Sequence, residues 1–344
     1  MQELKILRPD DFHVHLRQDG DLALTVRETA SVFRHALVMP NLKPAVLGWQ
    51  DVCDYVFKIQ DQVARLDITT FIPLLTFQVT AATTVLDVRQ CAPPICAAGK
   101  LYPAGVTTNS QNGVSDFEAL YPVFAEMEKL GRVLCLHGET PGAFSLDREF
   151  RFLETLMDLS EKFPGLRMVL EHLSTAAAVR CIEDLPDNVG ATITAHHLML
   201  TLDDVIGDLL QPHHFCKPIP KRPEDRKALI AAATGGNPKF FFGSDSAPHV
   251  KGMKECAFGC AGVFSAPVAI PVLAQVFEKY GALDKLEGFT SKHGAAFYGL
   301  SPKIAGFPDR DIVTLRKEPW TVPDRIGKRF VPFMAGETLD WKLV

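Results

Sequence analysis

The chain has 344 residues, of which 47% are hydrophobic and 22% charged, and its formal net charge is −5. This composition is ordinary for a globular protein, and its slight acidity gives no electrostatic reason to expect nucleic acid or an acidic membrane as a partner. No stretch reaches the roughly 18 apolar residues that a membrane span needs, and the charged N-terminus lacks the apolar region of a signal peptide. We therefore expect a cytoplasmic protein that binds neither membranes nor nucleic acid.

Short apolar runs alternate with longer amphipathic segments over the first 243 residues. Runs such as VLCLH and FFFGS are continuously apolar, which is typical of strands buried on both faces. The predicted strands are, in chain order, Asp11–Leu16, Ala36–Met39, Thr70–Leu75, Lys100–Pro103, Val133–His137, Arg167–His172, Ala191–Ala195 and Lys239–Gly243. The helical periodicity between them predicts helices at Trp49–Leu66, Asp116–Leu130, Phe150–Phe163, Thr175–Leu185 and Arg222–Ala233.

The rest of the chain is predicted to hold a helical hairpin, about Gly262–Lys279 and Leu286–Gly299, and a Pro-rich tail with a small extra strand at Asp311–Leu315. Eight strands that alternate with helices predict an α/β fold, the parallel (β/α)8 TIM barrel. An open doubly wound sheet is the alternative, but no Gly-x-Gly-x-x-Gly or Walker fingerprint follows any strand. We predict one barrel domain over residues 1–344, with a C-terminal extension from about residue 300 to 344.

The eight cysteines form no paired Cys-x2-Cys array, so a zinc ribbon is not expected. They are also too sparse for a disulfide scaffold, and we expect all of them to be reduced.

Several predicted strands end in residue types that bind metal ions. His13 and His15 are two residues apart on a strand and therefore point to the same face, where they can hold one ion. His137 and His172 end two further strands, and the last strand reaches Asp245. In a (β/α)8 barrel these ends meet at the C-terminal face, and imidazole and carboxylate are ordinary zinc ligands. The pattern therefore predicts a metal centre, although a lone His-x-His also fits two ordinary core or surface histidines.

The order of these motifs resembles the amidohydrolase superfamily, and closely the dihydroorotases that consist of the barrel alone. The resemblance covers about residues 4–300. The matching segments are Asp11–Arg17, Met39–Asn41, Lys100–Gly105, Leu136–Glu139, Glu171–His172 and Gly243–His249.

The resemblance implies two zinc ions per subunit. His13, His15 and Asp245 would bind one, and His137 and His172 the other. Lys100 would be carboxylated on its amine, and this carbamate would bridge both ions. A free ammonium beside two cations is electrostatically untenable, which agrees with that assignment.

The resemblance also implies the substrate and the reaction, the reversible cyclisation of N-carbamoyl-L-aspartate to L-dihydroorotate in pyrimidine biosynthesis. A hydroxide held between the zinc ions would attack the ring amide, with Asp245 as the acid and base. The net positive site suits this small anionic substrate. The residues implied to contact it are Arg17, Asn41, Thr107, Thr108, Lys217, His249 and Ala261.

Three details of the sequence extend or qualify the resemblance. Lys217 stands where the family leads us to expect an apolar residue, so any contact there would have to come from the backbone. The polar segment Gly105–Gly113 is predicted to be a mobile loop over the site. His196 and His197 are expected to end the seventh barrel strand and to have packing or supporting roles, with at least one pointing away from the barrel axis.

Two other functions remain open from the sequence. One is a hydantoinase-like cyclic amidase, although such proteins usually carry a β-sandwich built from both termini, for which the early position of His13 leaves no room. The other is a non-catalytic barrel subunit, which is disfavoured because no metal ligand is missing. The resemblance further suggests a homodimer.

Overall fold

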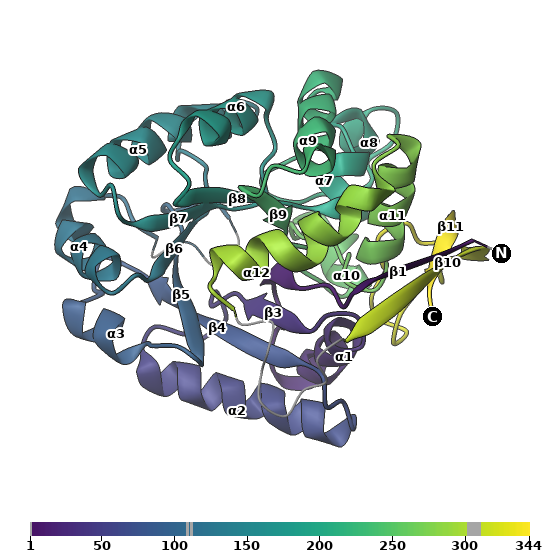
Figure 1. Cartoon of the computed structure of the whole chain (residues 1–344), viewed down its shortest axis with the longest axis horizontal. Helices are drawn as coiled ribbons and strands as arrows, with labels where there is room; N and C mark the ends of the chain where they lie inside the picture. Colours follow the sequence, from purple (N-terminus) through teal and green to yellow (C-terminus); the bar gives the residue numbers. More distant parts are fainter. Residues whose placement is uncertain (1, 108–109, 111–112, 301–310) are drawn as a thin grey trace.

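A ring of eight parallel strands forms the centre of the computed structural model, which describes residues 2–107, 110, 113–300 and 311–344 (Figure 1). Each strand pairs with the next one in the chain. The ring closes where Val14 bridges Ser246 and the Asp245 amide donates to the His13 carbonyl at 2.8 Å. The strands are β2 (Asp11–Val14), β3 (His35–Val38), β4 (Ile72–Val79), β5 (Cys96–Leu101), β6 (Val133–Leu136), β7 (Arg167–Leu170), β8 (Val189–Ile193) and β9 (Phe240–Phe242).

All eight predicted strands are confirmed, and the (β/α)8 fold with them, although several strand ends differ. The fourth strand starts at Cys96, before the predicted Lys100. The third extends from Ile72 to Val79, beyond the predicted Leu75.

Helices cover the outside of the ring (Figure 1). The longer ones are α1 (Asp19–Ala30), α2 (Trp49–Arg65), α3 (Val85–Gln90), α4 (Tyr121–Lys129), α5 (Arg148–Lys162), α6 (Ala176–Asp184), α9 (Pro223–Gly235) and α11 (Ala269–Lys279). The shorter ones are α7 (Ala195–Met199), α8 (Asp203–Ile206), α10 (Lys251–Lys254) and α12 (His293–Phe297). Single turns occur at η1 (Glu118–Leu120), η2 (Pro212–His214), η3 (Leu283–Lys285) and η4 (Gly288–Lys292).

The predicted helices follow from local sequence signals. In α2, Val52, Val56 and Ile59 are buried on one face, as the periodicity predicts. Asp116 accepts hydrogen bonds from the amides of Glu118 and Ala119, and so caps the turn that leads into α4.

One apolar cluster fills the inside of the ring. Its members come from seven of the eight strands and include Phe12, Leu74, Val169 and Phe241. Tyr298, just after α12, stacks on Phe12 with 4.9 Å between ring centroids. Each such buried side chain stabilises the fold by roughly 1.5–3 kcal/mol, and together they close the barrel interior on the side of α12.

A separate three-stranded antiparallel sheet joins the two ends of the chain, in the order β1 (Glu3–Leu7), β10 (Ile312–Thr321) and β11 (Thr338–Leu343). It lies at one edge of the barrel, at the right of Figure 1. The predicted tail strand is therefore confirmed and is longer than expected, whereas β1 and β11 were not predicted. Although the sequence suggested no room for a second sheet before His13, the N-terminal strand β1 belongs to a sheet outside the barrel. This strand has only five residues.

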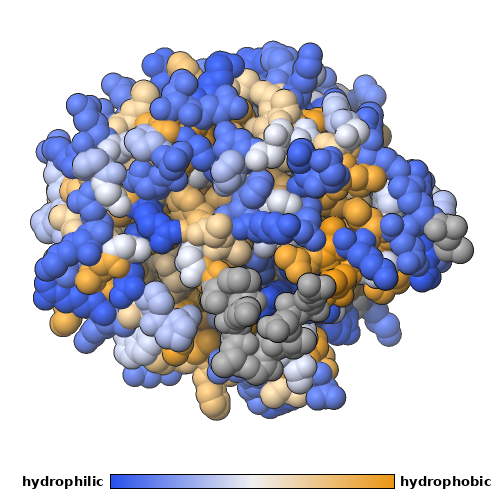
Figure 2. Space-filling view, viewed as in Figure 1, coloured by the Kyte–Doolittle hydropathy of each residue, from blue (hydrophilic) through white to orange (hydrophobic). Residues whose placement is uncertain are grey.

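Most of the surface seen in Figure 2 is hydrophilic, with smaller hydrophobic patches between the polar side chains. Within the part of the chain that the structure describes, no helix combines the length and hydrophobicity of a membrane span. All eight cysteines are free, as expected.

Candidate metal centre and substrate pocket

The four histidines predicted as metal ligands meet at the carboxyl ends of their strands. His13 belongs to β2, His15 and His137 directly follow β2 and β6, and His172 lies two residues after β7. The ring centroid of His172 lies 5.0 Å from that of His13 and 4.8 Å from that of His137. The ring centroids of His13 and His15 are 5.4 Å apart. All four are buried, so the structure brings them together in one site.

Asp245 joins two of these histidines from the segment after β9. Its Oδ1 lies 3.5 Å from His13 Nε2 and 3.3 Å from His15 Nε2. One ligand atom from each of the three residues lies within 4.8 Å of the others. Ligand atoms around one tetrahedral zinc are about 3.3 Å apart, so this group fits a single ion.

Lys100 lies on β5 with its side chain inside the barrel. Its Nζ is fully buried and has no hydrogen-bond partner among the described residues. Burial lowers the pKa of this amine, although the charges of Glu171 and Asp245 oppose the shift. An unpaired buried ammonium is costly, while a neutral amine is the form that reacts with carbon dioxide. The environment of Lys100 therefore fits a carbamate.

Two glutamates hold the histidine rings in defined orientations. His13 Nδ1 donates to Glu171 Oε2 at 2.8 Å, and Thr192 Oγ1 donates to the same oxygen. His137 Nε2 donates to Glu139 Oε2, also at 2.8 Å. These bonds leave His13 Nε2 and His137 Nδ1 as the nitrogens available to a metal. Sequence reasoning missed both glutamates as functional residues, although each lies within two residues of a ligand histidine.

Burial keeps several of these histidines in the form that binds metals. It lowers the pKa of His15 to about 4, and it also lowers the pKa values of His137 and His172. Burial alone would raise the pKa of Asp245, but the hydrogen bond from His15 and the charges of His13 and His15 outweigh it. The net result is a lowered pKa, so the Asp245 carboxylate is ionised at neutral pH.

Three predicted site residues have a strained backbone conformation. The backbone φ is 45° at His172, 41° at Asp245 and 60° at Arg17. All three values lie in the left-handed region, which residues other than glycine rarely adopt. Such a conformation costs about 1–3 kcal/mol per residue and persists only where the surroundings impose it. The fold therefore stabilises an unfavourable backbone at three predicted site residues.

A small cavity of about 30 Å³ lies beside the candidate metal ligands. Its wall includes six residues predicted to contact the substrate, which are Arg17, Asn41, Thr107, Lys217, His249 and Ala261. His15 and Asp245 line it as well, so the cavity adjoins the ligand group.

Arg17 is held by two contacts at the edge of this cavity. Its Nε donates to the Pro248 carbonyl at 2.8 Å, and its Nη2 donates to His249 Nε2 at 3.1 Å. These two contacts fix the orientation of the Arg17 guanidinium group beside the cavity.

The predicted loop Gly105–Gly113 is described only in part. Thr108 and the residues 109, 111 and 112 lie outside the described residues. Of the rest, Ser110 is buried, and its Oγ accepts a hydrogen bond from the Thr107 amide. Gly113 also approaches the backbone of Tyr102 and Pro103 so closely that a Cβ there would come within 2.7 Å of it.

His196 and His197 do not end a strand, and that prediction was wrong. The chain leaves β8 at Ile193 and turns into helix α7, where Thr194 Oγ1 accepts from the His197 amide. The alternation of side chains along a strand therefore does not apply to them. Both histidines are buried.

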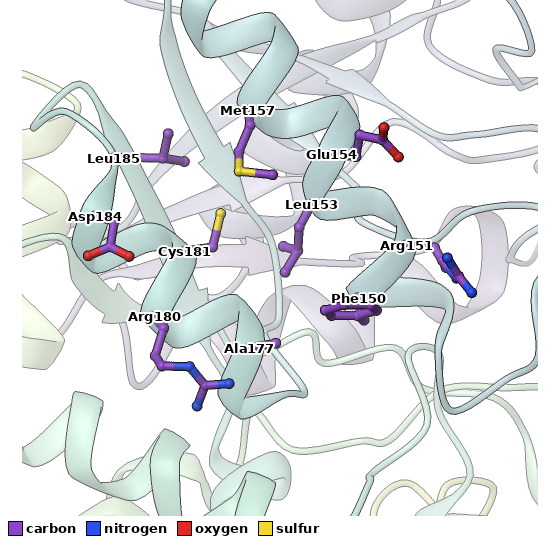
Figure 3. Close-up of a pocket in the computed structure, with 10 residues that line it drawn as sticks. All are labelled: Phe150, Arg151, Leu153, Glu154, Met157, Ala177, Arg180, Cys181, Asp184 and Leu185. Atoms are coloured by element: carbon purple, nitrogen blue, oxygen red, sulfur yellow. The ribbon is translucent and has the colours of Figure 1, made fainter.

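A larger groove of about 530 Å³ lies between α5 and α6, on the outside of the barrel. Figure 3 shows its wall, with Phe150 and Met157 from α5 facing Arg180 and Cys181 from α6. None of the predicted site residues lines it, so it is separate from the candidate metal centre.

The whole chain is similar to known proteins. No family model matches it. A curated dihydroorotase from Teredinibacter turnerae is 46% identical over an alignment of 346 positions, gaps included, that covers 99% of this chain and 98% of that protein. Another from Aromatoleum aromaticum is 44% identical over an alignment of 352 positions that covers 100% of both.

Solved structures of dihydroorotases are also similar to this chain over nearly its whole length. Dihydroorotase from Saccharomyces cerevisiae, crystallised with 5-fluoroorotic acid, has a TM-score of 0.90 and 36% identity over 100% of this chain and 99% of that one. The Campylobacter jejuni dihydroorotase has the same TM-score and 40% identity, over 99% of this chain and 97% of that one. An L-hydantoinase from Arthrobacter aurescens shares the fold, with a TM-score of 0.80 at 17% identity, over 98% of this chain and 82% of that one. The full-length identity to curated dihydroorotases decides between these two kinds of relative: the chain belongs to the dihydroorotase family.

Proposed function

We propose that this protein catalyses the reversible cyclisation of N-carbamoyl-L-aspartate to L-dihydroorotate and water at a two-zinc centre. The observation that carries the proposal is the buried convergence of four histidines, Lys100 and Asp245 at one end of the barrel. The family supplies the reaction, and the side chains supply ligands for the metal.

Zinc would be held by His13, His15 and Asp245 on one side and by His137 and His172 on the other, with the carboxylated Lys100 as the bridge. Bound there, the two ions would lower the pKa of a water molecule and polarise the amide carbonyl.

Asp245 is the proposed acid and base. In ring opening, its ionised carboxylate accepts a proton from the attacking water and delivers it to the leaving amide nitrogen. Ring closure follows the same path in reverse, so it starts with Asp245 protonated.

Arg17, Asn41 and His249 are proposed to hold the α-carboxylate of the substrate, because a guanidinium fork matches a carboxylate and all three line the cavity. Thr107, Thr108, Lys217 and Ala261 are proposed as further substrate contacts. Since the cavity holds only about 30 Å³, which is room for one or two water molecules, it must widen when substrate enters.

We further propose that the enzyme acts in pyrimidine biosynthesis in the cytoplasm, as a homodimer, with no nucleic-acid or membrane partner. The family membership supports these assignments.

An assay of two substrates tests the proposed reaction. Purified enzyme should open dihydroorotate, followed in the ultraviolet, much faster than it opens hydantoin. Arg17→Lys should reduce kcat/KM for dihydroorotate, because an ammonium cannot make the paired contact. Equal turnover of the two rings would favour a general cyclic amidase and contradict the proposal.

A further inference from the structure

A second group of metal-binding side chains lies outside the candidate centre. His196 and His197 come from α7, and Cys216 lies in the segment between η2 and α9. One ligand atom from each lies within 4.8 Å of the others, and His197 Nε2 is 4.0 Å from Cys216 Sγ. All three residues are almost completely shielded from solvent.

His196 gives an independent indication that something binds here. Both of its ring nitrogens are buried, and neither has a hydrogen-bond partner among the described residues. A neutral imidazole carries one donor and one acceptor, and burying both unpaired is unfavourable. The nearest rings are those of His197, at 4.7 Å, and Phe333, at 6.3 Å.

We propose that His196, His197 and Cys216 bind a third metal ion, of the thiophilic kind that includes Zn²⁺. Two imidazoles and one thiolate are a ligand set for such ions. The site shares no residue with the two-metal centre, so the inference does not depend on the proposed function.

The distances require only a small rearrangement. Around a tetrahedral zinc, nitrogen and sulfur ligands lie about 3.4–3.6 Å apart, compared with 4.0 Å between His197 Nε2 and Cys216 Sγ. The Pro218 carbonyl lies 3.0 Å from that nitrogen and 3.3 Å from that sulfur, and so can supply a fourth ligand.

Protons must leave or move when the ion binds. The Cys216 thiol, which now donates to the Pro218 carbonyl, loses its proton to solvent and becomes the thiolate ligand. His197 Nε2, which donates to the same carbonyl, must give up its hydrogen. The ring can carry it on Nδ1 instead, because Thr194 Oγ1 lies 2.9 Å away and can accept it. The ammonium of Lys254, which donates to the Phe215 carbonyl next to Cys216, adds positive charge that favours the thiolate.

The ion would connect the segment that borders the substrate cavity to helix α7. Cys216 directly precedes Lys217, which lines that cavity, while α7 continues from the barrel strand β8. Metal bound here would therefore fix the Lys217 segment to the barrel.

Cobalt substitution tests the proposal, because sulfur is absent from the ligands of the two-metal centre. Metal-free enzyme loaded with Co²⁺ should show a thiolate-to-cobalt charge-transfer band in the near ultraviolet. Cys216→Ser and His196→Gln should each remove that band and one bound ion per chain. Melting temperatures of the metal-free variants show whether each one folds.

Matched controls come from the other cysteines. Cys181→Ser, at a half-buried position on α6, and Cys91→Ser, near Cys96, should keep the band. Absence of the band in cobalt-saturated wild type would overturn the proposal. So would a band that survives Cys216→Ser in a folded variant.

Discussion

Two of the candidate ligand histidines are oriented by neighbouring side chains. Glu171 and Glu139 each accept a hydrogen bond from a ligand histidine and so determine which ring nitrogen is free. Lys100 has no such partner among the described residues. This contrast is consistent with histidines already oriented to bind a metal ion and with a lysine whose amine is carboxylated.

Replacing Lys100 with alanine should abolish activity and metal binding together, because the proposed bridge is removed. Short carboxylic acids added in solution should restore part of both. Metal content and ring-opening rate, measured with and without acetate, check this. Full metal content in an inactive Lys100→Ala variant would show that the lysine has another role.

Glu171→Gln should weaken zinc binding by roughly 10- to 100-fold, which is typical when the partner of a ligand histidine is lost. The side-chain amide of the new glutamine can still face His13. Because it offers a donor as well as an acceptor, it does not fix the His13 tautomer as the carboxylate does. Competition with a chelator measures the affinity, and excess zinc should restore much of the activity. Glu183→Gln, at an exposed position on α6, is the control. Unchanged zinc affinity in Glu171→Gln would refute the positioning role.

Asp245 predicts opposite pH dependences for the two directions. Ring opening needs the ionised form to accept a proton, so hydrolysis should rise with pH to a plateau as the Asp245 cluster loses its proton. Cyclisation needs the protonated form and consumes a proton overall, so it should fall as pH rises. The apparent pKa belongs to the whole cluster and should be shared by both directions. Parallel pH profiles, or substantial turnover by Asp245→Asn with both metals bound, would contradict this assignment.

The convergence of the candidate ligand residues could be predicted from the sequence because they lie at or just after strand ends, in an order that matches a known family. The role of Glu171 could not, because it bonds His13 from a distant strand end, and no local sequence pattern indicated the positive φ of His172 and Asp245. His196 and His197 show a limit of alternation arguments, since the chain had already turned into a helix at Ala195.

At the level of elements, a buried carboxyl group connects α5 to the start of α6. Glu149 on α5 is buried, and it accepts hydrogen bonds from the Ser174 amide and the Thr175 hydroxyl at the start of α6. Burial raises its pKa to about 7, against the lowering effect of Lys221 and these bonds.

This raised pKa makes a prediction about stability. Between its ordinary value of 4.5 and about 7, Glu149 binds a proton in the folded chain but not in the unfolded one. Its contribution is therefore present at low pH and is lost as pH rises through that window, by on the order of 3 kcal/mol in total. Urea unfolding of wild type and Glu149→Gln at pH 5 and pH 7.5 measures it. The difference in unfolding free energy between the two proteins should change with pH, and a constant difference would contradict the prediction.

Strand ends were harder to predict than the strands themselves. The run at Cys96–Leu101 begins with small residues that carry little hydrophobic signal, so the sequence placed its start at Lys100. The short β1 and β11 were missed because each is completed only by pairing with β10 from a distant part of the chain.

For the whole molecule, the small sheet formed by the two ends of the chain is attached to the barrel through Trp341. This residue is fully buried, and its Nε1 donates to Glu278 on α11. The attachment lies on the outside of the barrel, and no metal ligand belongs to it.

Trp341→Ala should therefore destabilise the protein by roughly 3–5 kcal/mol, without changing KM for dihydroorotate at temperatures where the variant is folded. Phe57→Ala, at a position that is 72% exposed, is the control and should have little effect. Thermal unfolding and steady-state kinetics check both variants. A selective rise in KM would instead indicate that the sheet supports the substrate site.

Anomalous diffraction at the zinc edge, from crystals of zinc-loaded active enzyme, tests the two-metal centre most directly. We expect one zinc peak among His13, His15 and Asp245, a second beside His137 and His172, and planar carbamate density on Lys100 between them. A single zinc peak at the barrel mouth, or an unmodified Lys100 in active crystals, would contradict it.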